Sequence, residues 1–239
     1  MPSKQKNHAH TVAGLDVAPM NTGYSKRWGK TGEIRGVIKS PEDLGSENDL
    51  FSIEQFTYLA FYLQEIIKEC DLVAIESLAY SAHGNQTKNI AGVNWLAQFL
   101  CYVNAVPYTM VLPQHVKMFA GVKGNAKKVL VREGVRKIWG ENLRNDNIAD
   151  AFILMKMAQA IVNREERQKL SESQVAVLQR PVRIQEIRHR KAMVAELGRQ
   201  LETSMLATGI VKRDREALFT ILTGPISQQL GSVSTVQDS

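Results

Sequence analysis

Four acidic side chains stand where strands are expected to end and a helix to begin. Asp16 closes the apolar, β-branched run HTVAGLDV, and Glu76 closes the apolar run DLVAIES. Asp146 and Asp150 stand four residues apart, where a polar stretch becomes an apolar, helix-forming one. Four residues turn a helix by about 400°, so these two carboxylates face the same way. Like charges this close repel each other, which favours a cation between or in front of them.

Carboxylates that converge from separate elements are typical of sites for divalent metal ions. Mg²⁺ prefers hard oxygen ligands, and two-metal hydrolysis of a phosphodiester needs several carboxylates. On its own, an Asp before a turn is more often a turn former. Here, however, apolar residues carry Asp16 and Glu76 into or near the core, where an unpaired charge is costly. With Asp150, they favour a metal site at the carboxyl edge of an α/β sheet, where sites usually form.

The hydrophobic pattern predicts the elements that hold these acids. We expect strands over 10–17, 23–30, 33–40, 71–77 and 106–113. We expect helices over 53–70, 85–106, 127–139 and 144–170, and two more in the C-terminal part, over 184–206 and 215–222. The first three strands read as an antiparallel meander, and the later strands alternate with helices, which predicts an α/β fold.

Composition narrows the class of protein. The chain has 239 residues, a net charge of +6 and an estimated pI of 9.3, which weakly favours polyanionic partners. No apolar run approaches the roughly 18 residues that span a bilayer, and the N-terminal stretch lacks the apolar core of a secretory signal. We therefore expect a cytoplasmic protein with no membrane partner. Cys70 and Cys101 lie in apolar segments, so we expect buried free thiols.

Four sequence blocks, in this order, resemble the RuvC-type Holliday-junction resolvases (crossover junction endodeoxyribonucleases) of the ribonuclease H-like superfamily. They are GLDVAPMNTGYS, LVAIES, GVKGNAKK and NIADAF, within residues 10–163, and KGNAKK resembles phage-encoded members. The resemblance implies a ribonuclease H-like α/β fold with a mixed five-stranded sheet, three antiparallel strands then parallel strands, flanked by helices. We expect a basic N-terminal tail over 1–9, the nuclease domain over 10–164, and a helical C-terminal extension with a frayed end over 165–239.

The resemblance also implies roles for the acids. Asp16 would be the ligand shared by two Mg²⁺ ions per active site, with Glu76 and Asp150 completing the coordination and Mn²⁺ as a possible substitute. The family's fourth ligand position lies one turn before the last Asp. Asn147 stands three residues back from Asp150 and Asp146 four back. Asn is a poor substitute for an acid, so we favour Asp146, whose alternative role is a helix-start acid favoured by the helix dipole.

Basic and aromatic residues near these acids are candidates for holding DNA. The block AGVKGNAKKVLV places Lys123, Lys127 and Lys128 at the start of a helix, where exposed amides and lysines suit a phosphate. The resemblance favours Lys128 most, with Lys117 a weaker candidate. Tyr80, four residues past Glu76, approximates the family's aromatic wedge. The alternatives are a solvated basic helix and an ordinary surface tyrosine.

The helix over 85–106 is apolar on more than one face. Trp95, Phe99 and Tyr102 are either simple core or, as the resemblance implies, part of a homodimer contact.

The function implied is Mg²⁺-dependent hydrolysis of branched DNA. The family resolves four-way junctions by paired symmetric nicks, needs no small-molecule cofactor, and leaves 5′-phosphate and 3′-hydroxyl ends. The alternative is a catalytically inactive module of the same fold that binds branched DNA or a protein partner. Retention of three costly acids, Asp16, Glu76 and Asp150, argues against inactivity. A sugar-kinase or actin-like fold is disfavoured because the turn after Asp16 lacks the glycine that nucleotide phosphates require.

Overall fold

A computed structural model of the chain describes residues 10–41, 52–78, 85–179 and 184–185, with the side chains of 85–87, 184 and 185 excepted. The predicted basic tail over 1–9, Tyr80, the helix over 215–222 and most of the extension over 165–239 lie outside the described residues. None of the helices in the described ranges is long and apolar enough to cross a membrane.

A mixed sheet forms the centre of the fold, with strands in the order β3-β2-β1-β4-β5-β6. Strands β1, β2 and β3 pair antiparallel, whereas β1, β4 and β5 pair parallel. The predicted mixed five-stranded sheet is confirmed in β3-β2-β1-β4-β5, and β6 adds a sixth strand at its edge. The strands are β1 (Val12–Asp16), β2 (Asn21–Trp28), β3 (Gly32–Lys39), β4 (Leu72–Glu76), β5 (Tyr108–Val111) and β6 (Ile184–Gln185).

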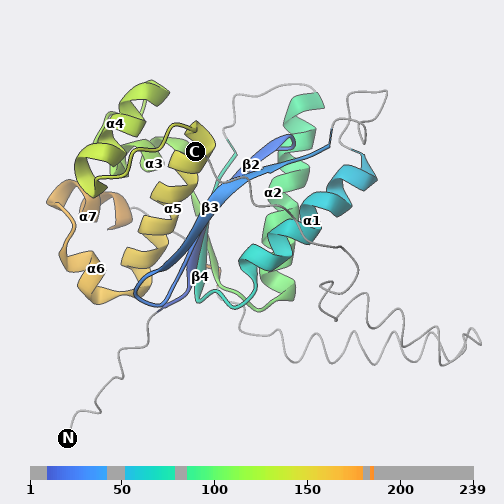
Figure 1. Ribbon diagram of the computed structural model, residues 1–239, viewed down its shortest axis with the longest axis horizontal. Coiled ribbons are helices and arrows are strands. Elements are labelled where there is room, and N and C mark those ends of the chain that lie inside the picture. Colours follow the sequence, from blue (N-terminus) through green and yellow to red (C-terminus); the bar gives the residue numbers. More distant parts are fainter. Residues whose placement is uncertain (1–9, 42–51, 79–84, 180–183, 186–239) are drawn as a thin grey trace, which may run out of the picture. The chain divides into compact units, whose positions relative to one another are not determined.

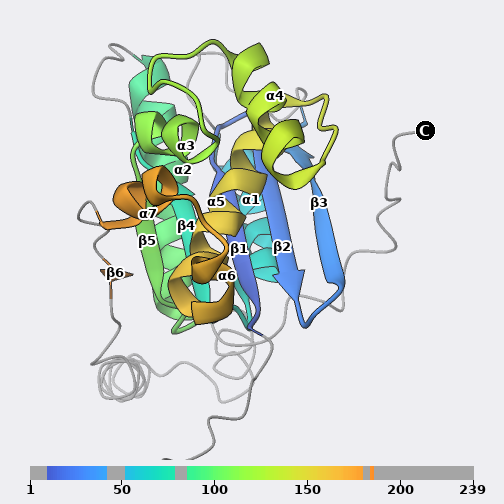
Figure 2. The ribbon, with the colours of Figure 1, turned by 90° about the vertical axis from the view of Figure 1, so that its left-hand side faces the viewer.

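Helices cover both faces of this sheet (Figures 1 and 2). Helices α1 and α2 lie on one face, and α3 to α7 lie on the other. The helices are α1 (Ile53–Ile67), α2 (Asn85–Val103), α3 (Pro113–Phe119), α4 (Lys128–Trp139), α5 (Asp146–Val162), α6 (Arg164–Gln168) and α7 (Glu172–Gln179).

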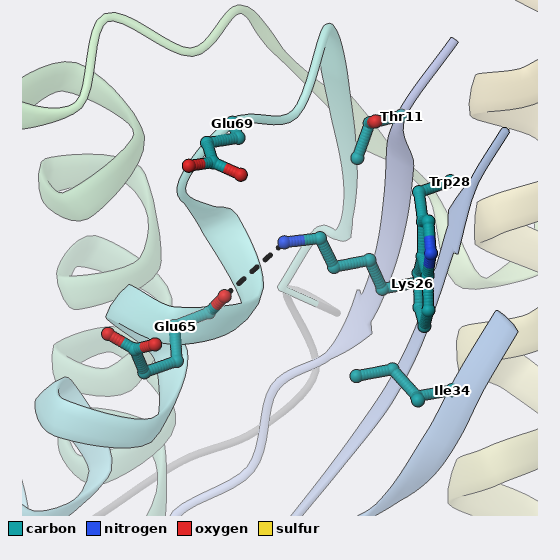
Figure 3. Close-up of a pocket in the computed structure, with 6 residues that line it drawn as sticks. All are labelled: Thr11, Lys26, Trp28, Ile34, Glu65 and Glu69. Atoms are coloured by element: carbon teal, nitrogen blue, oxygen red, sulfur yellow. Dashed lines mark hydrogen bonds between the residues drawn. The ribbon is translucent and has the colours of Figure 1, made fainter. Parts of the chain in front are cut away.

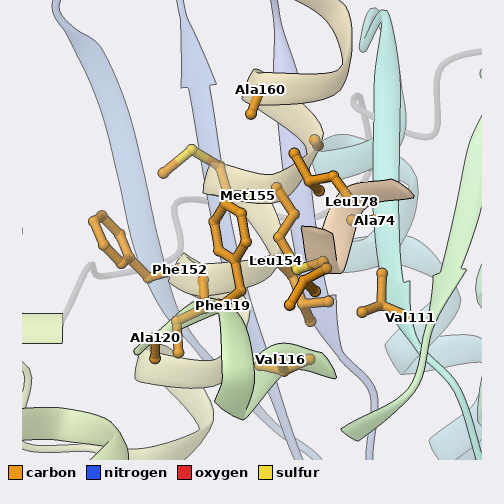
Figure 4. Packing of buried hydrophobic residues seen from close by; sticks show 14 of the residues in the cluster. Ala74, Val111, Val116, Phe119, Ala120, Phe152, Leu154, Met155, Ala160 and Leu178 are labelled. Carbon is orange, nitrogen blue, oxygen red and sulfur yellow. The ribbon is translucent and has the colours of Figure 1, made fainter. Parts of the chain in front are cut away.

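Alternate residues of the buried strands supply two separate cores. Val12 and Ala74 face the core built with α3, α4, α5 and α7 (Figure 4), whereas Ala13 and Ile75 face the core built with α1 and α2. This period of two is the expected geometry of a strand buried on both faces. Cys70 and Cys101 are buried in the second core as free thiols, as predicted.

An aromatic group joins α3, α4 and α5 in the first core. The ring of Trp139 stacks on that of Phe119 at a centroid distance of 6.0 Å and meets that of Phe152 edge to face at a centroid distance of 5.7 Å. These contacts are of the stacked and edge-to-face kinds that aromatic rings prefer. The C-terminal end of α4 is therefore fixed against both neighbouring helices.

The predicted helices differ from the observed ones at several places, and α7 was not predicted. The helix expected over 144–170 ends at Val162, because Asn163 is extended and its side chain accepts hydrogen bonds from the amides of Glu165 and Glu166, which starts α6. Pro113 does not merely end a strand: it occupies the first turn of the unpredicted helix α3. The start of the helix expected over 184–206 is instead β6, which pairs antiparallel with β5.

Helix α5 lies unusually close to the strands beneath it. A methyl group on Gly14 of β1 would stand 2.1 Å from the carbonyl oxygen of Ala151, and one on Gly23 of β2 would stand 2.2 Å from the carbonyl oxygen of Asn147. Only glycine permits backbones to approach this closely. Asp16 follows Gly14 by two residues and Asp150 immediately precedes Ala151, so this contact brings the two acids to the same end of the sheet.

Replacing Gly14 by alanine is expected to separate α5 from β1. We predict that Gly14→Ala lowers the free energy of unfolding by about 2 kcal/mol or more, because backbone atoms of α5 cannot move aside cheaply. Urea denaturation followed by circular dichroism measures the difference. The control is Gly92→Ala in α2, where the nearest atom to an added methyl group is 3.9 Å away. Its expected effect is neutral or stabilising by up to about 1 kcal/mol. Equal stability of the two variants would contradict the close approach.

Candidate active site

Asp16 and Glu76 meet at the carboxyl ends of two neighbouring parallel strands. Leu15 of β1 pairs with Ile75 of β4, so the following residue of each strand is an acid at the same edge. The carboxyl group of Glu76 donates a hydrogen bond to the carboxylate of Asp16. The end of β4 is held from the other side by Asn94 of α2, a buried residue whose Nδ2 donates to the Glu76 carbonyl oxygen at 2.8 Å.

Burial raises the pKa of both acids, and the charge of Asp16 raises that of Glu76 further. Burial is the chief cause that raises the pKa of Asp16, and the hydrogen bond from Glu76 and the charge of Lys128 oppose it. The pKa of Glu76 rises to about 9, first through burial and then through the negative charge of Asp16. At neutral pH, therefore, the pair retains a proton that two ordinary carboxyl groups would have lost.

Asp150 joins this pair from the first turns of α5. Its pKa rises to about 7, because of burial first and the charge of Asp16 second, while Lys128 and Lys117 lower it. Its charge in turn raises the pKa of Glu76. The structure thus brings together the three acids that the sequence singled out, from β1, β4 and α5.

The two candidates for a fourth acidic position point to different neighbours. Asn147 Nδ2 donates to the carbonyl oxygen of Asn21 at 2.9 Å, which fastens the start of α5 to β2. Asp146 instead faces α4, with Oδ1 at 3.1 Å from Arg132 Nη1 and Oδ2 at 3.9 Å from Lys128 Nζ. The side chain of Asn147 is therefore committed to the fold, whereas Asp146 forms ion pairs beside the acids.

The basic residues predicted to hold DNA divide into two groups. Lys117 on α3 and Lys128 at the start of α4 lie close enough to the acids to lower the pKa of Asp150. Lys123 and Lys127 are exposed in the segment that leads into α4. Arg132 was missed by the sequence analysis, although its spacing of four residues from Lys128 is the signal for a shared helix face.

The donor atoms suit Mg²⁺ in chemical kind. Asp16, Glu76 and Asp150 offer hard carboxylate oxygens from three separate elements, and the repulsion between them is what a divalent cation would relieve. In the described part of the chain, no three acidic, histidine or cysteine side chains are arranged tightly enough to hold a metal ion as they stand.

A separate hollow of about 380 Å³ lies at the opposite end of the sheet (Figure 3). It opens beside Thr11, at the start of β1, whereas Asp16 stands at the end of that strand. Lys26 crosses it and donates to the carbonyl oxygens of Glu65 and Lys68 at the end of α1. That contact satisfies the terminal carbonyl groups of a helix, so this hollow is a structural feature apart from the acids.

The raised pKa of Glu76 predicts a gain in stability when its charge is removed. The group binds its proton more tightly in the folded state, so its stabilising contribution is complete below its ordinary value of 4.5 and is lost as pH rises towards about 9. We expect Glu76→Gln, measured in EDTA, to be more stable than the wild type at pH 8.5 by more than ~1 kcal/mol.

Urea denaturation at several pH values tests this expectation. The gain from Glu76→Gln should shrink at pH 5, where the wild-type group holds its proton. The matched control is Glu133→Gln, at an exposed position of α4. A gain that does not change with pH would contradict the raised pKa.

Comparison with solved structures places the fold. No family model matches the chain, and no curated protein matches it. The solved structure of Thermus thermophilus RuvC superposes with a TM-score of 0.50 at 20% sequence identity, covering 64% of this chain and 96% of that one. Thermus thermophilus RuvC in complex with a Holliday junction substrate superposes with a TM-score of 0.50 at 18% identity, with the same coverage. The chain therefore has the ribonuclease H-like fold of these RuvC structures.

Proposed function

We propose that this protein is a Mg²⁺-dependent, structure-selective endodeoxyribonuclease that resolves Holliday junctions and other branched DNA by paired nicks. The observation that carries the proposal is the hydrogen-bonded pair of Asp16 and Glu76 at adjacent strand ends, with Asp150 close to it. Buried acids that repel one another destabilise a fold, so such a cluster favours a catalytic role. A RuvC structure of the same fold contains a Holliday junction substrate, which supports branched DNA as the ligand.

The proposed roles follow from where the side chains stand. Asp16, Glu76 and Asp150 would hold the metal, with Asp16 central because it lies next to both of the others. Two Mg²⁺ ions, or Mn²⁺ in their place, would supply an activated water and stabilise the leaving 3′ oxygen. Lys117 and Lys128 would draw the negatively charged DNA backbone towards an acidic cluster that would otherwise repel it.

Three further residues are proposed to contact DNA, Lys123, Lys127 and Tyr80. Lys123 and Lys127 are exposed where a phosphate approaching the start of α4 would meet them. Tyr80 remains our candidate for an aromatic wedge at the junction centre.

Cleavage of a mobile four-way junction tests the activity. We predict that the wild type nicks this substrate in Mg²⁺, that EDTA abolishes nicking, and that Asp16→Asn slows it by at least about 10²-fold through loss of a metal ligand. The control is Asp71→Asn, which removes a carboxylate near the start of β4, paired there with His10, at the far end of the sheet. Forks, flaps and linear duplex run in parallel define the preferred substrate. Binding of the junction without cleavage in any divalent metal would favour the alternative, a catalytically inactive module.

A homodimer is the proposed assembly, and exposed aromatic residues of α2 support it. Trp95 is 68% exposed and Phe99 is 59% exposed, one helical turn apart. Their exposure rules out the simple-core interpretation for these two residues. Large aromatic side chains are enriched in protein interfaces, so α2 is the proposed two-fold contact that would direct two active sites at opposite strands.

Replacing the centre of this surface by a charge tests the assembly. We predict that the wild type has a dimeric mass by light scattering at micromolar concentration and that Phe99→Glu is a monomer, because a buried unpaired carboxylate is costly. The control is Ile53→Glu, which introduces the same charge at a 70% exposed position of α1. A monomeric wild type would exclude this contact.

A further inference from the structure

The carboxylate of Asp146 forms ion pairs with two cationic side chains of α4, close to the three acids. Arg132 Nη1 lies 3.1 Å from one of its oxygens and Lys128 Nζ lies 3.9 Å from the other. The Lys128 side chain is 64% exposed, whereas those of Arg132 and Asp146 are 32% and 30% exposed. Both cations are therefore within reach of an anion that arrives from solution.

The positions of the two cations suit the binding of a phosphate group. Lys128 and Arg132 stand four residues apart on α4 and so share one helix face. Arg132 Nη1 also donates to the carbonyl oxygen of Arg144 at 2.8 Å, which fixes the guanidinium group in place. A fixed guanidinium beside a flexible ammonium suits a phosphate, which accepts hydrogen bonds from both.

Asp146 is a weak occupant of this place. Its Oδ1 atom is shielded from solvent yet accepts no well-aligned hydrogen bond from any described residue, despite the nearby Arg132. Partly exposed ion pairs contribute about 0–1 kcal/mol, and the Lys128 contact is long. DNA phosphates bring further negative charges and release counterions when they bind lysine and arginine. A phosphate can therefore displace the carboxylate.

A displaced Asp146 has a position to move to. It lies one turn before Asp150 on α5, on the same helix face. There it would be a fourth carboxylate beside Asp16, Glu76 and Asp150, a group that is not closed around a metal in the described structure.

We propose that Lys128 and Arg132 form a binding site for a backbone phosphate of DNA, and that the phosphate competes with Asp146, which on displacement turns towards Asp150 and the metal. This proposal rests on the proposed function only for its ligand, branched DNA. It assigns Arg132 to the DNA-binding surface and makes Asp146 a group that links DNA binding to metal binding.

Metal-free binding gives the first test, because it does not depend on cleavage. A fluorescent four-way junction is titrated with protein in EDTA at several salt concentrations. Asp146→Asn should bind ~3- to 10-fold more tightly than the wild type, because the competing carboxylate is gone. Arg132→Gln should bind about 10-fold more weakly and reduce the salt slope by about one. The control is Lys137→Gln, which removes a positive charge from roughly the opposite side of the same helix. It should weaken DNA binding less than Arg132→Gln does.

Metal binding without DNA gives the second test. Mn²⁺ binding is measured by electron paramagnetic resonance. The Arg132→Gln variant lacks the cation that holds Asp146. This variant should therefore bind Mn²⁺ several-fold more tightly than either the wild type or the Lys137→Gln control. The double variant Arg132→Gln with Asp146→Asn should lose that gain. An ion pair with only a structural role would not weaken DNA binding and strengthen metal binding at once.

The outcomes separate this proposal from the nuclease proposal. Metal-free affinity that is unchanged or weaker in Asp146→Asn would overturn the competition, whatever the cleavage assay shows. The same holds if the double variant keeps the Mn²⁺ gain of Arg132→Gln. If both tests give the expected results while no substrate is cut, the phosphate site stands and the nuclease proposal fails.

Discussion

The close approach of α5 to the sheet is the constraint on which the candidate site depends. Two strands present glycine where the backbone of α5 crosses them, Gly14 on β1 and Gly23 on β2, and a side chain at either place would collide with backbone atoms. Because both contacts are rigid, the helix has little freedom to slide or turn over the sheet. Asp150 therefore keeps its place beside the end of β1. A larger residue at Gly14 would move the helix and the acid together.

The acids at this edge are held together against their own repulsion. The pKa values of Asp16, Glu76 and Asp150 are all raised, with burial as the first cause. The charges of neighbouring acids add to the rise for Glu76 and Asp150. Lysines from α3 and α4 oppose this effect without forming close ion pairs with the three acids in the described structure. The apolar cores on both faces of the sheet stabilise the fold and so offset the unfavourable energy of this cluster. Proteins commonly store unfavourable electrostatics at the places where they do chemistry.

Much of the fold follows from local patterns, and what does not follow depends on tertiary contacts. The buried strands β1 and β4 are apolar runs that each end in an acid, so the sheet and its two carboxylates, Asp16 and Glu76, are predictable from the chain alone. The end of α5 was missed because a single side chain, Asn163, serves as the cap of the next helix. The partners of Asp146 and Asn147 were not predictable, since α4 and β2 meet the start of α5 only in the folded chain. The exposure of Trp95 was not predictable either, since it depends on which face of α2 packs against the sheet.

The aromatic group at the end of α4 gives the protein an internal optical probe. Of the three tryptophans in the sequence, Trp95 is 68% exposed and Trp28 is 43% exposed, whereas Trp139 lies between Phe119 and Phe152. The emission of an indole depends on the polarity around it, so Trp139 should supply the blue-shifted part of the fluorescence. The same helix carries Lys128 and Arg132 at its other end. Any tilt of α4 that follows an event at those cations would therefore change the colour and intensity of the light that Trp139 emits.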